Sequence, residues 1–330
     1  MSSVRSAEPA TTRLEPDREL PVQPPALAGI EGQGWVERGG PLALGLKIAT
    51  VLTTPMPRRL RYGIADIGGT AAYALLPGRA RRARVNYSAF ADGNRAASAQ
   101  LARGAFRNYA RTILDFLVLE KLLQELKQSP GALPMEPLYR VLADGKGAIV
   151  VTPHLGNWDL GAAAIATCGY PVHAITDRFG PPEVDGMIRA SRERLGVGVI
   201  PIGPASAREA LRALRRNEVL LLACDIDKGG SGVPVQFLGQ QLVLPAGPAT
   251  LSLRTGARLI PGYLRRRPDG SHESRLLEPL AQPLAGDSQA RVADLTQSIA
   301  TAFEAMIRTE PSQWFAFHSL SRTAPGTPRQ

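Results

Sequence analysis

Residues that build metal centres and disulfide frameworks are scarce in this chain. Its 330 residues include two cysteines and four histidines. Cys168 and Cys224 each lie in apolar surroundings, and their spacing fits neither a disulfide framework nor a zinc site. Such cysteine usage is typical of a reducing compartment. We therefore expect no resident metal and no other cofactor.

Several catalytic motifs are also missing. The chain has no G-x-S-x-G turn, no G-x-x-x-x-G-K-[ST] loop, no H-E-x-x-H helix and no G-x-G-x-x-G after a strand. Each of these motifs supplies a group that its chemistry needs, such as an exposed serine nucleophile or a glycine-rich phosphate cradle. Their absence argues against a serine hydrolase, a P-loop enzyme and a zinc protease.

Long apolar runs are absent as well, although two shorter runs occur after the first 40 residues. Neither reaches the ~20 residues that span a bilayer comfortably. One run is interrupted by Lys47 and the other by Asp66. Both fit helices in a membrane interface as well as ordinary core helices. Residues 1–40 begin without the apolar core of a signal peptide and are expected to form a disordered tail.

Positive charge is in excess and is concentrated in one region. The formal net charge is +10. Residues 51–111 contain eleven arginines but only two acidic residues, Asp66 and Asp92. A basic surface attracts phosphate groups, which indicates a nucleic acid or an anionic membrane as a partner. A solvated basic face without a partner is the alternative.

The order of apolar patterns predicts an α/β fold. Residues 41–56 and 62–77 are apolar with helical spacing, and 96–128 is one long helical stretch. From Leu138 onward, short β-type runs alternate with helical segments, which is typical of a mostly parallel sheet flanked by helices. After the N-terminal tail we expect N-terminal helices over 41–128, an α/β core over 129–321 and a C-terminal tail over 322–330.

The segment "GAIVVTPHLGNWDLGA", residues 147–162, carries the first candidate site. His154 follows an expected strand, and sites in parallel sheets lie beyond the carboxyl ends of the strands. Histidine takes up a proton near neutral pH, and it acts as a base when a second group holds its tautomer. Asp159 is the candidate for that second group, and Asn157 can cap the helix that follows. The alternative is a core histidine bonded to a nearby aspartate.

Two other clusters carry charge where a ligand could bind. Asp225 and Asp227 end a buried strand as a D-x-D pair, but no histidine or third carboxylate follows closely enough to indicate a metal. Arg178 and Arg192 belong to an arginine-rich span, and guanidinium groups pair with phosphate or carboxylate. For any single arginine, an exposed helix position with i,i+4 pairing is the competing interpretation.

Taken together, these motifs resemble the glycerolipid acyltransferases. "HLGNWD" is similar to their H-x4-[DE] motif, and the pattern is closest to the bacterial lipid A lauroyl/myristoyl acyltransferases and the phosphatidylinositol mannoside acyltransferases. The same branch is matched, in order, by "RVNYSAF", "DIDKGGSGVPVQFLG", "PAGPATLSLRTGARLIP" and "PSQWFAFH". The resemblance runs from about Leu42 to Ser321. Where the mannoside acyltransferases often have Glu at the strand end, this chain has Asp225.

The resemblance implies an acyltransferase that transfers groups other than amino-acyl groups. It implies that His154 takes a proton from an acceptor hydroxyl and that Asp159 orients the histidine. The hydroxyl oxygen then attacks the thioester of an acyl-CoA or an acyl carrier protein. The residues expected to bind the substrates are Asn157, Arg178, Arg192, Asp225 and Asp227.

The acceptor implied by the resemblance is a glycolipid: first a phosphatidylinositol mannoside, then a lipid A precursor, with a lysophospholipid third. The N-terminal helices would face an anionic membrane, at the cytoplasmic face of the inner membrane, with no nucleic-acid partner. The competing function is a non-catalytic basic protein that binds nucleic acid or anionic lipid. Arginines around an apolar patch would favour a membrane, whereas a continuous basic stripe without apolar neighbours would favour nucleic acid.

Overall fold

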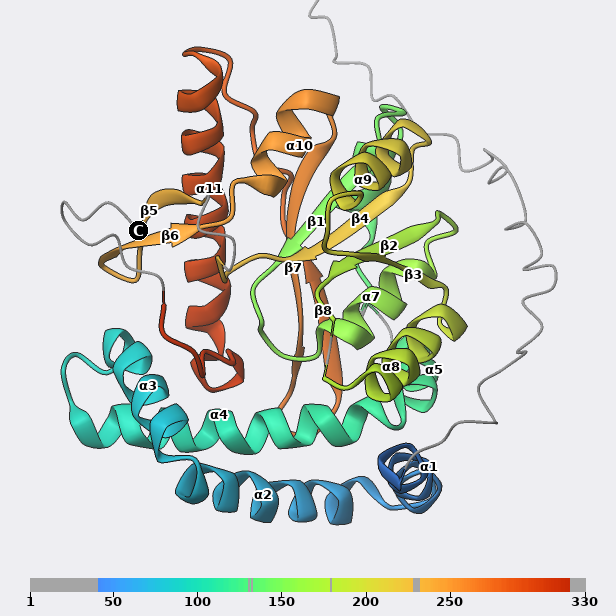
Figure 1. The fold of residues 1–330 in the computed structure, drawn as a ribbon, viewed down its shortest axis with the longest axis vertical. Coiled ribbons are helices and arrows are strands. Elements are labelled where there is room, and N and C mark those ends of the chain that lie inside the picture. The colour runs from blue at the N-terminus through green and yellow to red at the C-terminus, as the bar shows by residue number, and fades with distance from the viewer. Residues whose placement is uncertain (1–40, 130, 132, 179, 228–231, 321–330) are drawn as a thin grey trace, which may run out of the picture. The chain divides into compact units, whose positions relative to one another are not determined.

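The computed structural model of the chain describes residues 41–129, 131, 133–178, 180–227 and 232–320 (Figure 1). The expected tails over 1–40 and 322–330 lie outside the described residues. So does most of the glycine-rich loop that follows Asp227 in the sequence.

A six-stranded sheet forms the centre of the described part. Its strand order is β3-β2-β4-β1-β7-β8, and every neighbouring pair is parallel except β7 and β8. This confirms the expected mostly parallel sheet flanked by helices. The strands are β1 (Ala148–Thr152), β2 (Val172–Thr176), β3 (Val197–Pro201), β4 (Val219–Ala223), β7 (Arg258–Arg266) and β8 (His272–Leu276), with a separate hairpin of β5 (Val233–Phe237) and β6 (Gln240–Leu244).

Both faces of the sheet are buried, because successive side chains of a strand point to opposite sides. In β1, Ile149 and Val151 belong to the apolar cluster that includes α9, α10 and α11. Ala148 and Val150 belong to the cluster that includes α5, α6 and α7. The helices around the sheet are α5 (Leu119–Lys127), α6 (Glu136–Leu142), α7 (Trp158–Ala166), α8 (Pro182–Arg194), α9 (Ser206–Arg215), α10 (Gly247–Thr255) and α11 (Ser288–Thr309).

From residue 41 onward, four helices precede the α/β core, and α2 packs along the length of α4 (Figure 1). In the described part of the chain, no helix combines the length and the apolar character that crossing a membrane requires. The bounds of the four helices are α1 (Pro41–Thr53), α2 (Arg58–Leu75), α3 (Pro77–Tyr87) and α4 (Arg95–Phe116), with a short 3-10 turn, η1 (Ser88–Phe90), between the last two.

The helical stretch expected over 96–128 is two helices. α4 ends at Phe116 and α5 begins at Leu119, although neither proline nor glycine lies between them. The break follows from packing: apolar residues of α4 join the cluster on one face of the sheet, and those of α5 join the cluster on the other. A single straight helix would not reach both clusters.

Four elements lie outside the segments expected from the sequence, namely α3, α6, β6 and β8. β6 pairs with β5 through a two-residue turn, in which Leu238 and Gly239 both have positive φ. Turns of this kind are usually recognised by Asn-Gly or Asp-Gly, so a Leu-Gly turn gives little sequence signal.

Candidate active site

The loop after β1 is held in place by the chain's C-terminal segment. The backbone N–H of Phe315 donates to the carbonyl of His154 (2.8 Å), and that of Gly156 donates to the carbonyl of Gln313 (2.9 Å). Leu155 forms an isolated antiparallel bridge with Trp314. These bonds place His154 beyond the carboxyl end of β1, where the sequence predicted it.

Residues of the motif "RVNYSAF" form further hydrogen bonds with the same C-terminal segment. Asn86 Nδ2 donates to the carbonyls of Ala316 and His318, both at 2.9 Å. The hydroxyl of Tyr87 donates to the carbonyl of Trp314. Residues of α3 therefore support the segment that in turn supports the His154 loop.

Gly156 allows the loop to pass directly over β7. Its φ is +67°, and a Cβ atom at this position would lie 1.9 Å from the carbonyl oxygen of Leu264. Asn157 can then donate its backbone N–H to the same carbonyl (2.9 Å) and begin the next helix. A side chain at 156 would push the loop away from the sheet.

Gly156→Ala is therefore expected to lower the free energy of unfolding by at least about 2 kcal/mol, because a left-handed backbone and a steric clash both oppose the alanine. Gly93→Ala is the matched control, since Gly93 also has a positive φ (+78°) but has nothing within 4 Å of its added Cβ. Urea denaturation of both variants measures the difference. Equal losses of stability would show that close packing on β7 is unimportant.

His154 is paired with a buried carboxylate from the neighbouring strand. Its Nδ1 lies 2.5 Å from Oδ1 of Asp225, and the other carboxylate oxygen accepts a hydrogen bond from Trp314 Nε1 (2.8 Å). The side chain of Asp225 is 1% exposed, whereas that of His154 is 29% exposed. With Nδ1–H donated to Asp225, Nε2 is the basic nitrogen of the ring.

The carboxylate of Asp225 is held in its charged form. Burial by itself would raise its pKa, but the attraction of His154 and the hydrogen bonds from His154 and Trp314 outweigh burial and lower the pKa. A charged carboxylate bonded to Nδ1 fixes the tautomer of the histidine and stabilises the imidazolium that forms when Nε2 takes a proton. This arrangement has the properties of a base and its orienting partner.

The structure differs from the sequence expectation for Asp159. Asp159 lies in the first turn of α7, and its carboxylate accepts a hydrogen bond from Arg192 Nε of α8 at 2.7 Å. Asp225, rather than Asp159, is the residue bonded to His154. The reason is strand register: Thr152 of β1 lies opposite Ala223 of β4, so the residues two positions further on also come together.

The other expected site residues occupy varied positions. Asn157 is buried and caps α7, because its side-chain oxygen accepts from the backbone N–H of Leu160 (3.0 Å). Arg178 is exposed just after β2. Asp227 is half-buried, two residues beyond Asp225. All three follow the carboxyl ends of parallel strands.

Trp314 was not assigned a role from the sequence, yet it completes the hydrogen bonding of Asp225. It is fully buried and packs edge-on against Tyr87, Phe90 and Phe237. The sequence indicated Trp314 only as part of the family-like segment "PSQWFAFH". Its distance from His154 along the chain gives no sign that the two residues lie in the same site. Among the described residues, no cluster of three or more histidine, cysteine or acidic side chains could hold a metal ion.

The sequence also matches a known protein family. The model of the bacterial lipid A biosynthesis acyltransferases matches residues 42–323. The chain belongs to this family. It is therefore an acyltransferase of lipid biosynthesis, and the family resemblance found in the sequence is confirmed.

Three relatives illustrate the range of this family. The phosphatidylinositol mannoside acyltransferase of Mycolicibacterium smegmatis is 29% identical over 287 residues, which cover 85% of this chain and 92% of the relative. The protein of the same name from Mycobacterium tuberculosis is 32% identical over 197 residues, 59% of this chain and 60% of the relative. The lipid A biosynthesis lauroyltransferase of Escherichia coli is 27% identical over 197 residues, 58% of this chain and 61% of the relative.

Proposed function

We propose that the protein transfers a fatty acyl chain from a thioester to a hydroxyl group of a glycolipid, with His154 as the base and Asp225 as its positioning partner. The observation that carries the proposal is the 2.5 Å contact between a partly exposed histidine and a buried, charged carboxylate. The donor is an acyl-CoA or an acyl carrier protein. The favoured acceptor is a phosphatidylinositol mannoside, because two of the relatives described above carry that name.

The proposed chemistry needs no covalent enzyme intermediate. His154 Nε2 takes the proton of the acceptor hydroxyl while the oxygen attacks the carbonyl carbon of the thioester. The resulting tetrahedral oxyanion collapses, the C–S bond breaks, and the sulfur leaves with the proton that the imidazolium returns. Asp225 stays charged throughout and stabilises the imidazolium.

We propose further that Arg178 binds a phosphate group of the donor or the acceptor, because it is exposed beyond the end of a sheet strand. Asp227 is placed to bind acceptor hydroxyls. The pair formed by Asp159 and Arg192 ties α7 to α8, and the remaining N–H groups of Arg192 are donors for a phosphate. Asn157 shapes the same end of the sheet by capping α7.

An exposed apolar surface on the N-terminal helices supports the same function. Large apolar side chains of α1 and α2 are exposed, with Ile67 74% exposed. Exposed arginines precede and follow the apolar positions of α2, with Arg59 before them and Arg79 and Arg81 after them. Exposed arginines in the same helices as exposed apolar side chains favour an anionic membrane over a nucleic acid. We therefore place the protein peripherally on the cytoplasmic face of the inner membrane.

An acyl-transfer assay tests the proposed function. Purified protein is mixed with palmitoyl-CoA or palmitoyl carrier protein and with phosphatidylinositol mannosides, a lipid A precursor or lysophospholipids. We expect one acceptor to be acylated and the His154→Ala variant to be inactive on it. Transfer that survives in His154→Ala would refute the proposed base. Failure of every acceptor with both donors would refute the proposed substrates.

A further inference from the structure

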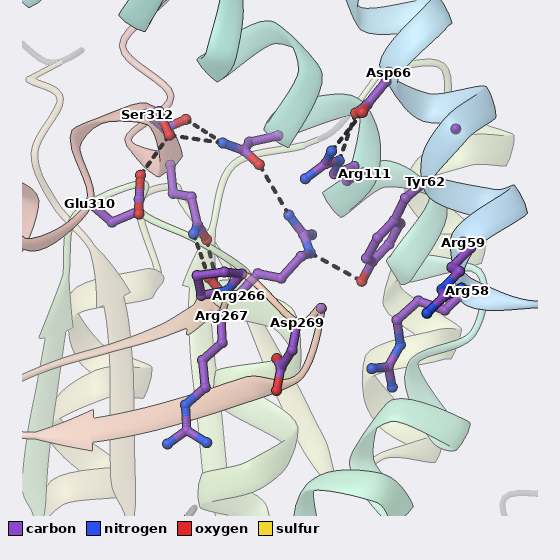
Figure 2. Close-up of a pocket in the computed structure, with 15 residues that line it drawn as sticks. Arg58, Arg59, Tyr62, Asp66, Arg111, Arg266, Arg267, Asp269, Glu310 and Ser312 are labelled. Atoms are coloured by element: carbon purple, nitrogen blue, oxygen red, sulfur yellow. Dashed lines mark hydrogen bonds and ion pairs between the residues drawn. The ribbon is translucent and has the colours of Figure 1, made fainter.

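A basic cavity lies beside the N-terminal helices, and neither His154 nor Asp225 lines it. Its volume is about 610 Å³, and its walls come from α2, α4, the end of β7 with the turn after it, and the short turn η2 (Pro311–Gln313) (Figure 2). Five arginines and three carboxylates line it, and two of the arginines, Arg58 and Arg267, are paired with Glu125 and Glu273, which do not line it. The charged residues are Arg58, Arg59, Arg111, Arg266, Arg267, Asp66, Asp269 and Glu310.

The carboxylates of the cavity are already engaged with groups of the protein. Asp66 accepts two hydrogen bonds from Arg111, both at 2.6 Å. Glu310 accepts from the hydroxyl of Ser312 (2.7 Å). Within the described part of the chain, Arg59 has no hydrogen-bond or ion-pair partner and is exposed. An incoming anion would therefore find a cation that is not yet neutralised.

The wall behind the cavity adds further positive charge. Two buried guanidinium groups, those of Arg61 and Arg266, share a single buried carboxylate, Asp115. Burial lowers the pKa of His272 next to them, which leaves that ring neutral at neutral pH. Figure 2 shows Arg266 reaching across the cavity wall to the hydroxyl of Tyr62. A buried excess of one positive charge makes the neighbouring space attractive to an anion.

An apolar hollow adjoins the basic cavity. It has a volume of about 510 Å³ and is lined by Ile67, Thr70, Ala71 and Ala74 of α2, together with Asp66 and Arg107. Asp66 lines both the hollow and the basic cavity. One ligand could therefore place an anionic group in the cavity and an apolar chain in the hollow.

We infer that these two adjoining spaces bind one anionic phospholipid, with its phosphodiester in the basic cavity and an acyl chain along the hollow of α2. Arginines pair with phosphate oxygens, and the small side chains of the hollow leave room for an alkyl chain. The site is separate from the reaction centre, and it deepens the proposed membrane association, on which its role rests. It would hold the protein on a phospholipid rather than hold a substrate for acyl transfer.

Binding of a monomeric short-chain lipid tests the site without a bilayer. Dihexanoyl-phosphatidylglycerol, titrated calorimetrically at low salt, is expected to bind. Arg59→Ala is expected to weaken the affinity about fivefold, since an arginine near an anionic lipid contributes about that factor. Ala71→Asp, which puts a charge into the hollow, is expected to weaken it at least as much. Arg208→Ala, a change at an exposed arginine of α9, is the matched control and should bind normally.

Two further ligands separate the sources of phosphate. Inorganic phosphate and adenosine 3′,5′-bisphosphate are expected to bind much more weakly than the lipid, because neither has an acyl chain. Equal binding of either compound would overturn the proposed lipid site, and so would unchanged lipid binding by both variants.

Flotation with phosphatidylglycerol vesicles distinguishes this site from membrane association in general. If the protein binds vesicles but not the monomeric lipid, the proposed lipid site is refuted and the proposed membrane-facing surface is retained. If it binds neither vesicles nor the monomeric lipid, both proposals are refuted. The His154→Ala variant should bind the lipid as the unchanged protein does, whatever its activity.

Discussion

Replacing Asp225 with asparagine is expected to lower kcat for acyl transfer by about 10³- to 10⁴-fold, because the histidine loses the carboxylate that fixes its tautomer. An asparagine keeps the size of the side chain but presents an amide to Nδ1 and Trp314. The histidine would then be held without a negative charge beside it, and the imidazolium formed in the reaction would lose its stabilisation. KM for the acceptor should change little, because the side chain of Asp225 is 1% exposed and its two oxygens are bonded to His154 and Trp314.

Asp159→Asn is the discriminating comparison, since Asp159 is the aspartate of the H-x4-D motif. Its carboxylate is bonded to Arg192, so we expect kcat to fall less than tenfold, together with a modest loss of stability of about 1–3 kcal/mol. Asp225→Glu keeps the negative charge and should retain more activity than Asp225→Asn. Steady-state kinetics on all three variants measure these effects. A loss in Asp159→Asn equal to that in Asp225→Asn would contradict the assignment made from the structure.

Asp115→Asn is expected to lower the free energy of unfolding by about 3–5 kcal/mol, because removing one partner of a buried ion pair leaves the other charge uncompensated. Asp115 is fully buried and binds Arg266 at 2.6 Å and Arg61 at 3.4 Å. It also accepts from the hydroxyl of Tyr62 (3.2 Å). These contacts join α4 to α2 and to β7, so the loss should affect the attachment of the N-terminal helices to the sheet.

Thermal and urea denaturation measure this effect, and Asp144→Asn at an exposed position is the control that should be within about 0.5 kcal/mol of the unchanged protein.

The pH dependence of stability provides a second measurement of the role of Asp115. Burial would raise the pKa of Asp115, but His272 and Arg266 outweigh burial and lower it. Its contribution to stability is therefore complete above about pH 4, the unfolded pKa, and is lost as the pH falls through the lower folded value. The free energy of unfolding of Asp115→Asn should therefore fall less at acid pH than that of the unchanged protein. The same acid dependence in both proteins would contradict this role of Asp115.

Much of the sheet could be predicted from the sequence, because its strands read as apolar runs between turn signals. β1 and β4 are buried on both faces, which makes their sequences continuously apolar. β8 was missed because it reads "HESRL", a polar sequence. It is buried through ion pairs rather than apolar packing: Glu273 accepts from Arg265 (3.0 Å) and Arg267 (2.7 Å).

The candidate site was predictable in its residues but not in their pairing. His154 and Asp225 were both placed at strand ends from the sequence. Their contact depends on β4 lying next to β1, and the local sequence of either strand does not predict the order of strands in the sheet. Asp159 was the nearer aspartate in sequence, so spacing alone favoured it. The role of Trp314 depends on the C-terminal segment returning to the sheet, which no short-range signal reveals.

The return of the C-terminal segment also sets the order in which the protein can become active during synthesis. Gln313, Trp314 and Phe315 hold the His154 loop and the Asp225 carboxylate, although 89 residues separate Trp314 from Asp225. A nascent chain that has reached α11 already contains every strand of the sheet but lacks these supports. The proposed reaction centre is thus among the last parts to be assembled, and a chain shortened before Gln313 should be unable to position it.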